Sequence, residues 1–112
     1  MTAARYDLVI DQGSDFAIEF TVSQSGSVKN LDGYSARAQL RPTKSSNTLT
    51  ASFTCNIPNA VNGKINMSLP NATSNSIAAG NYQYDLEIFT SSDTVVQKLL
   101  FGEVVINQGV TR

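Results

Sequence analysis

The sequence predicts an all-β fold, in which one domain of residues 1–112 forms an antiparallel β-sandwich of about seven strands. The clearest sign is the segment 80–88, where apolar or aromatic residues alternate with polar ones. Such alternation requires a sheet with one buried face and one solvated face. Similar short segments, separated by turn residues, recur along the chain, as is typical of sandwiches. A chain of this length that is 41% hydrophobic can bury one core.

The segment 80–88 also carries a more specific pattern. Tyr82 follows a tight corner and lies two residues before Tyr84, which stands at the position that antibody domains fill with cysteine. This is the local pattern of the sixth strand of an immunoglobulin-like sandwich. We therefore expect Tyr82 to be the corner tyrosine of a single immunoglobulin-like antiparallel β-sandwich, with Tyr84 in the place of the cysteine.

Alternation and turn residues define the individual strands. Gly13 and Gly33 mark turns because glycine adopts positive φ without strain. Pro42 ends a strand because it cannot donate to a ladder. The predicted strands are residues 6–11, 16–22, 34–41, 49–57, 65–69, 80–88 and 95–107.

Two irregular features are also predicted. One short helical turn is expected near residues 71–79, closed by Gly80 at its C-terminus. The parity of apolar residues in the last strand shifts near Gly102, which indicates a β-bulge there.

The predicted topology has a consequence for the charged residues. In a seven-strand immunoglobulin-like sandwich the third and sixth strands are neighbours. Their outward residues are Arg37, Gln39 and Arg41 on one strand, and Gln83, Asp85 and Glu87 on the other. We expect cross-strand ion pairs here, each worth about 0.2–1 kcal/mol. The alternative is that these side chains are simply solvated.

Composition and charge exclude several classes of function. The net charge is −1 and the basic residues are not clustered, so nucleic acid is not an expected partner. The sequence has neither an apolar run of membrane-spanning length nor a basic amphipathic stripe, so a membrane is not expected either. The first residues lack the apolar core of a signal peptide, which predicts synthesis in a cytoplasm.

The chain offers few groups for catalysis or metal binding. It has no histidine, which removes the commonest general base and transition-metal ligand. Cys55 is the single cysteine, and its inward position predicts a buried structural residue. Asp11 and Asp15 flank Gly13 with a spacing that fits turn capping and not a calcium loop. We therefore predict no catalytic, cofactor-binding or metal-binding residue.

One aromatic side chain is a candidate for recognition. Phe89 has outward parity at the end of the sixth strand, where a buried residue is not required. An exposed ring at this position could stack on a sugar ring. The favoured alternative is that Phe89 packs under the next hairpin.

Several segments resemble one known group of proteins. They are residues 6–16 (YDLVIDQGSDF), 31–41 (LDGYSARAQLR), 79–87 (AGNYQYDLE) and 109–112 (GVTR). Together they resemble small β-sandwich structural proteins of tailed bacteriophages, the immunoglobulin-like accessory domains of tails and baseplates, including the N-terminal domains of upper-baseplate proteins. The resemblance implies a virion component that binds other virion proteins and carries no catalytic residue. The Asn- and Ser-rich residues 43–62 depart from the pattern.

These observations predict a non-enzymatic bacteriophage virion protein, specifically a tail or baseplate component made in the host cytoplasm. It is expected to assemble in multiple copies with itself and other virion proteins through strand edges and loops. The candidate edges are residues 7–12 and 104–112. The alternatives are a capsid decoration or neck protein, and a carbohydrate-binding module for host attachment. An enzyme is least favoured, because no acid, base and nucleophile come together in the sequence, and no cofactor is expected.

Overall fold

The computed structural model describes residues 3–24 and 26–110. Its strands are β1 (Ala4–Arg5), β2 (Leu8–Asp11), β3 (Phe16–Thr21), β4 (Ser23–Gln24), β5 (Ser27–Val28), β6 (Ser35–Arg41), β7 (Ala51–Asn59), β8 (Lys64–Leu69), β9 (Gly80–Phe89) and β10 (Val96–Asn107). Its helical segments are α1 (Asn71–Ser76) and the 3-10 turn η1 (Ser91–Asp93). The chain is therefore mostly β-structure, as predicted.

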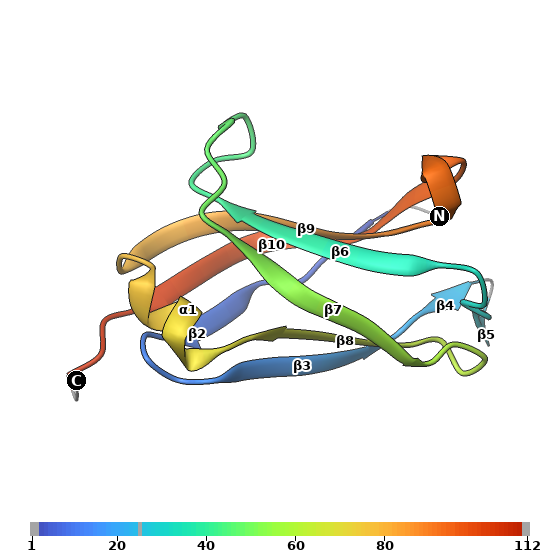
Figure 1. Cartoon of the computed structure of the whole chain (residues 1–112), viewed down its shortest axis with the longest axis horizontal. Helices are drawn as coiled ribbons and strands as arrows, with labels where there is room; N and C mark the ends of the chain where they lie inside the picture. The colour runs from blue at the N-terminus through green and yellow to red at the C-terminus, as the bar shows by residue number, and fades with distance from the viewer. Residues whose placement is uncertain (1–2, 25, 111–112) are drawn as a thin grey trace.

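The strands form one strongly curled sheet that folds into two facing layers (Figure 1). The order of hydrogen-bonded strands is β1-β10-β9-β6-β7-β8-β3, and β2 also pairs with β10. Strand β7 belongs to both layers, because its residues up to Phe53 pair with β6 and later residues pair with β8. Strands β4 and β5 form a separate two-stranded ribbon. The predicted all-β, sandwich-like fold is confirmed.

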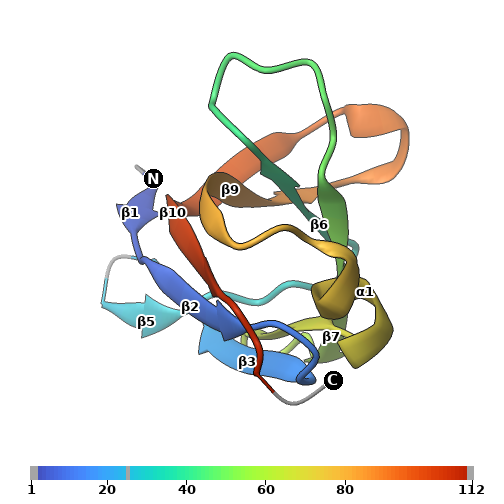
Figure 2. The same ribbon diagram turned by 90° about the vertical axis from the view of Figure 1, so that its left-hand side faces the viewer.

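The first strand differs from the prediction in its direction. An antiparallel sheet was expected throughout, but β1 and β2 run parallel to β10, with Leu8 opposite Val104. Parallel pairing is possible because the chain crosses to the opposite layer at the Gly13 turn (φ 81°), and the rest of the domain then connects β2 to β10. Strands β2 and β10 therefore run side by side (Figure 2). Alternation of side chains could not reveal this, because it is the same for both strand directions.

The inward residues of both layers form one continuous core. On β9, Tyr84, Leu86 and Ile88 are buried, as the alternation predicted. Burial of each large apolar side chain stabilises the fold by about 1.5–3 kcal/mol. The largest fully buried apolar side chains are Ile10, Leu31, Leu40, Ile65, Met67, Leu69, Leu86, Ile88, Val104 and Ile106. They come from both layers, so packing between the layers holds the sandwich together.

Tyr82, which was expected to be the corner tyrosine, binds the backbone through its hydroxyl. Its hydroxyl donates to the carbonyl oxygen of Ala78 at 2.6 Å, four residues upstream. Tyr82 is half-buried, whereas Tyr84 is only 4% exposed inside the sandwich. The bond ties the start of β9 to the segment that follows α1.

The helix is shorter than predicted. It ends at Ser76, and Ile77 already has an extended backbone (φ −91°, ψ 126°), so Gly80 does not close the helix but begins β9. The reason is that Ile77 turns out of the helix to bury its side chain in the core, where it is 3% exposed.

Ser74 is fully buried and anchors α1 to the turn between β2 and β3, because its hydroxyl donates to the carbonyl of Ser14 at 2.8 Å.

The β-bulge lies earlier in β10 than predicted. The register between β9 and β10 shifts between Lys98 and Leu100, so Leu99 is the extra residue. Leu99 is buried, and this burial compensates for the ladder bonds that a bulge disrupts. Gly102 itself pairs in regular register with Tyr84. Gly102 is therefore needed for a reason other than a bulge.

That reason is a kink in the chain at Tyr6 and Asp7, between β1 and β2, which we call the β1–β2 kink. The carbonyl oxygen of Tyr6 lies so close to Gly102 that a Cβ atom there would overlap it. The hydroxyl of Tyr84 donates to the same carbonyl at 2.5 Å. The carboxylate of Asp7 accepts a hydrogen bond from the backbone N–H of Glu103 at 2.9 Å. Because Gly102 has no side chain, the β1–β2 kink can lie directly against β10.

These contacts shift two pKa values. The hydrogen bond from the Glu103 backbone lowers the pKa of the Asp7 carboxyl, and Arg5 at 3.2 Å adds to the effect. Burial raises the pKa of the Tyr84 hydroxyl well above its ordinary value of 10.0, and the nearby Asp7 carboxylate raises it further. Asp7 therefore remains an acceptor, and Tyr84 a donor, from mildly acidic to alkaline pH.

Candidate functional site

The charged residues of β6 and β9 meet as predicted, and an ion pair joins the two strands. Strands β6 and β9 are neighbours, and Arg37 lies opposite Glu87, with Nε and Oε1 2.5 Å apart. Asp85 instead binds Lys98 of β10, with Nζ and Oδ2 2.8 Å apart. Because of this contact, the pKa of Lys98 is raised. Arg41 donates to Gln39 of its own strand at 2.8 Å and reaches neither carboxylate.

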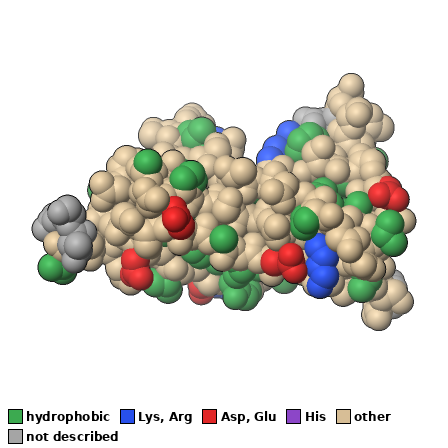
Figure 3. Space-filling view, turned by 60° about the horizontal axis from the view of Figure 1, so that its bottom comes forward, with side chains coloured by type: hydrophobic (Ala, Val, Ile, Leu, Met, Phe, Trp, Pro, Cys, Tyr) green, Lys and Arg blue, Asp and Glu red, His purple; other side chains and the backbone are tan. Residues whose placement is uncertain are grey.

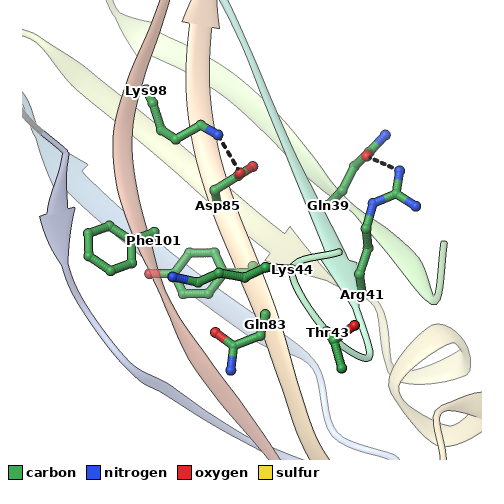
Figure 4. Close-up of a pocket in the computed structure, with 9 residues that line it drawn as sticks. Gln39, Arg41, Thr43, Lys44, Gln83, Asp85, Lys98 and Phe101 are labelled. Carbon is green, nitrogen blue, oxygen red and sulfur yellow. Dashed lines mark hydrogen bonds and ion pairs between the residues drawn. The ribbon is translucent and has the colours of Figure 1, made fainter. Parts of the chain in front are cut away.

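A hollow of ≈ 360 Å³ lies on the outer face of β6, β9 and β10, beside the loop of residues 42–50. We call it the outer pocket (Figure 4). The loop projects from the sheet at the top of Figure 1, and its Lys44 side chain reaches back across the hollow. The lining residues are Gln39, Arg41, Thr43, Lys44, Gln83, Tyr84, Asp85, Lys98 and Phe101.

The outer pocket has an excess of positive charge. Lys98 is neutralised by Asp85, the one carboxylate that lines the hollow. The two other cations are held by uncharged groups: Arg41 by the Gln39 amide, and Lys44 by the Phe101 ring, whose centroid is 5.0 Å from Nζ. In the part of the chain that the structure describes, neither has a carboxylate partner. The pocket can therefore accept an anionic group.

Strands β2 and β3 present unpaired edges on the two sides of the main sheet. Within the described ranges, β3 pairs only with β8, and β2 pairs only with β10. The edge predicted at residues 7–12 is thus in place. The second predicted edge was residues 104–112. This prediction is wrong for Val104–Asn107, because this part of β10 lies between β2 and β9. Residues 111–112 of the predicted edge lie outside the described chain. The edge at β3 was not predicted, because its alternation resembles that of an interior strand.

An apolar hollow of ≈ 230 Å³ opens between β1 and the end of β3. It reaches core residues of β9 and β10, and the bulge residue Leu99 contributes to it. Nearby, the rings of Tyr6 and Phe20 pack edge to face with centroids 5.5 Å apart. The lining residues are Ala4, Phe20, Thr21, Val22, Ser23, Leu86, Leu99 and Leu100. An extended segment paired with β3 could place an apolar side chain here.

The ring of Phe89 is not an open platform for a sugar. The guanidinium of Arg37 lies over it, with the carbon of the guanidinium 4.2 Å from the ring centroid. Phe89 is half-buried, and its partner is this cation of β6. The carbohydrate-binding alternative thus loses the aromatic residue on which it was based.

The remaining polar residues have structural contacts. Cys55 is half-buried against the core, less than predicted, and burial raises the pKa of its thiol from 9.0 to about 11. Asp15 accepts hydrogen bonds from the backbone and side-chain nitrogens of Asn71, so it caps the start of α1. In residues 3–24 and 26–110, no three His, Cys, Asp or Glu side chains converge to hold a metal ion. No helix within these ranges is long and apolar enough to cross a bilayer.

The raised pKa predicts slow reaction of Cys55 with thiol reagents. Because only the thiolate reacts, we expect iodoacetamide to alkylate the folded chain at pH 8 at least about tenfold more slowly than the chain unfolded in urea. The rate should increase as the pH rises toward 11, where the folded thiol ionises. Mass spectrometry at timed intervals measures both rates, and equal rates at pH 8 would contradict the assignment.

Comparison with known proteins gives a match in fold only. No protein-family model matches the chain, and a search of curated proteins finds no significant relative. The fold is similar to the N-terminal domain of ORF48 from phage TP901-1, with a TM-score of 0.61 and 10% identity over 89% of this chain and 83% of that one. At this identity the likeness shows a shared architecture.

Two further solved structures show a weaker likeness. InlP from Listeria monocytogenes has a TM-score of 0.50 and 13% identity, and the match covers 94% of this chain but only 28% of InlP. CopC from Methylosinus trichosporium OB3b has a TM-score of 0.48 and 8% identity, over 94% of this chain and 89% of CopC. The likeness to InlP, at this identity, is one of fold alone.

Proposed function

We propose that the chain is a non-enzymatic structural protein of a tailed-phage virion, a tail or baseplate component present in multiple copies. The observation that best supports this is the correspondence in fold to a phage protein domain over most of the length of both chains. The resemblance of segments in the sequence to tail and baseplate domains points the same way. In this proposal the protein is made in the host cytoplasm and becomes part of the particle.

The free edges support a role in assembly. Strands β2 and β3 each present one unpaired row of backbone donors and acceptors, to which a strand from a partner can add. The apolar hollow beside β3 would give such a strand a place for a side chain, which adds specificity to backbone pairing. Partners of the edges are therefore other virion proteins with extended segments.

The proposal is tested by locating the chain in particles. Purified virions should contain it at a fixed copy number by quantitative mass spectrometry, and antibody labelling should place it on the tail or baseplate in electron micrographs. Labelling of the head or neck would instead support a decoration or neck protein. Detection only in the lysate of infected cells, and never in purified particles, would reject a structural role in the virion.

A further inference from the structure

Acidic residues are concentrated in one part of the chain. Residues 7–19 contain Asp7, Asp11, Asp15 and Glu19 and no Lys or Arg. All four carboxylate residues are exposed, and they are spaced along the segment that contains β2, the Gly13 turn and β3. Figure 3, which brings the lower face of Figure 1 forward, shows acidic side chains spaced along that face. We call this set of four residues the acidic strip.

Within the described part of the chain, one member of the acidic strip lacks a partner. Three of its carboxylates bind groups of their own molecule: Asp7 binds Arg5 and Glu103, Asp11 binds Asn107, and Asp15 binds Asn71. Glu19 has neither a hydrogen bond nor an ion pair within residues 3–24 and 26–110, and it projects from β3 at the edge of the sheet. It is also the longest acidic side chain of the four. Glu19 is therefore available to a second molecule.

One cation does lie on the strand next to Glu19. Lys64 of β8 is opposite Thr21, whereas Asn66 is opposite Glu19. Lys64 is therefore two residues along β8 from the position that faces Glu19. Its ammonium is held by the hydroxyl of Thr21, with Nζ and Oγ1 2.7 Å apart. Lys64 therefore does not neutralise Glu19 by direct contact.

The outer pocket has the complementary properties. Its Arg41 and Lys44 are held on opposite sides of the hollow by uncharged partners, and neither binds a carboxylate within the described structure (Figure 4). The hollow of ≈ 360 Å³ is large enough to admit a glutamate side chain. A carboxylate beside Lys44 would form a charge-assisted hydrogen bond with its ammonium, and the guanidinium of Arg41 would add to the positive potential of the hollow.

We infer that Glu19 of one copy binds in the outer pocket of a second copy, where its carboxylate pairs with Lys44 and the positive charge of Arg41 adds to the attraction. This inference rests on the proposed function, because it names the partner for assembly in multiple copies. The two surfaces are different, so the contact is heterologous and repeats from copy to copy as a ring or a filament. The rest of the acidic strip steers the approach of the next basic pocket.

The test measures self-association of the full chain by sedimentation velocity and native mass spectrometry. We expect association to weaken about tenfold or more when salt rises from about 0.05 M to about 0.5 M, because screening acts on exposed charges. Glu19→Lys, and the double change Arg41→Glu with Lys44→Glu, should each weaken self-association by at least about tenfold. An equal mixture of these two variants should associate again, because the charges are exchanged between the two surfaces.

Matched controls separate this contact from loss of folding. Lys29→Glu makes the same charge reversal as Lys44→Glu, but Lys29 does not line the pocket, so it should change association less than about twofold. The neutral variants Glu19→Gln and Lys44→Gln replace the reversals if thermal unfolding shows that a reversal destabilises the fold. Lys44→Arg retains the cation and should retain association.

The outcomes distinguish this inference from the proposed function. A wild-type chain that stays monomeric, or variants that associate as wild type does, would overturn the inference even if the chain is found in virions. Association of wild type with a different virion protein through the pocket, without self-association, would also overturn it. Salt-sensitive self-association of a chain absent from virions would support the contact and reject the structural role in the particle.

Discussion

Replacing Gly102 by valine is expected to destabilise the fold by about 3 kcal/mol or more. The first added carbon would overlap the carbonyl oxygen of Tyr6 and would lie 2.8 Å from Oδ1 of Asp7. The β1–β2 kink would have to move away from β10, which would break the hydrogen bonds from Tyr84 and Glu103. Urea denaturation followed by circular dichroism measures the change in the free energy of unfolding.

A glycine in open space provides the control for Gly102. Gly33 has a positive φ of 84°, but no atom lies within 4 Å of the place that a Cβ would take, so Gly33→Ala should cost only about 1 kcal/mol of backbone strain. Gly102 has no positive φ, so Gly102→Ala tests the close approach alone. A Gly102→Ala chain as stable as wild type would show that the kink is not constrained by this contact.

Replacing Tyr84 by alanine is expected to cost about 4 kcal/mol, in the range measured for large aromatic residues in cores. The side chain is 4% exposed, and its ring packs against Phe53 with centroids 6.1 Å apart. Tyr84→Phe retains the ring and removes only the hydroxyl, which leaves the carbonyl of Tyr6 without its donor. That variant should lose about 1–2 kcal/mol. Urea denaturation measures both losses.

Tryptic cleavage tests the contribution of the Tyr84 hydroxyl separately from that of its ring. Loss of the hydroxyl should loosen the kink and increase the rate of cleavage after Arg5, which is exposed and immediately precedes Tyr6. Tyr82→Phe removes a hydroxyl that binds Ala78, far along the chain from the kink, and should leave this rate unchanged. If Tyr84→Phe is cut no faster than Tyr82→Phe, the hydrogen bond to Tyr6 does not hold β1 in place.

Local sequence patterns predicted the parts of the fold that depend on one strand at a time. The alternation around Tyr84 and Leu86 identified β9 and its buried face, because side-chain period follows from strand geometry alone. The neighbouring arrangement of β6 and β9 followed from the fold class. The direction of β2, the end of α1 at Ser76 and the bulge at Leu99 were missed, because each depends on packing between segments distant in sequence. Ile77, for example, ends the helix to reach a core that other strands build.

The candidate sites were less accessible to sequence reasoning. The outer pocket combines residues of β6, β9 and β10 with a loop that, from its composition, is only a polar connection. One indication was present in the sequence: Arg41 and Lys44 flank Pro42, with no carboxylate among residues 37–44. Gly102 was correctly singled out but for the wrong reason, because the residue that it accommodates, Tyr6, belongs to the other end of the chain.

The parallel pairing of β2 with β10 also determines how the molecule bears a mechanical load. The described chain starts at β1 toward one end of the long axis, which measures 43 Å, and leaves β10 toward the other end (Figure 1). Tension between them pulls β2 and β10 past each other along their length, so the ladder bonds from Leu8 to Asp11 are stretched together instead of opening one after another. A chain stretched between its ends would thus resist extension by shear across this strand pair.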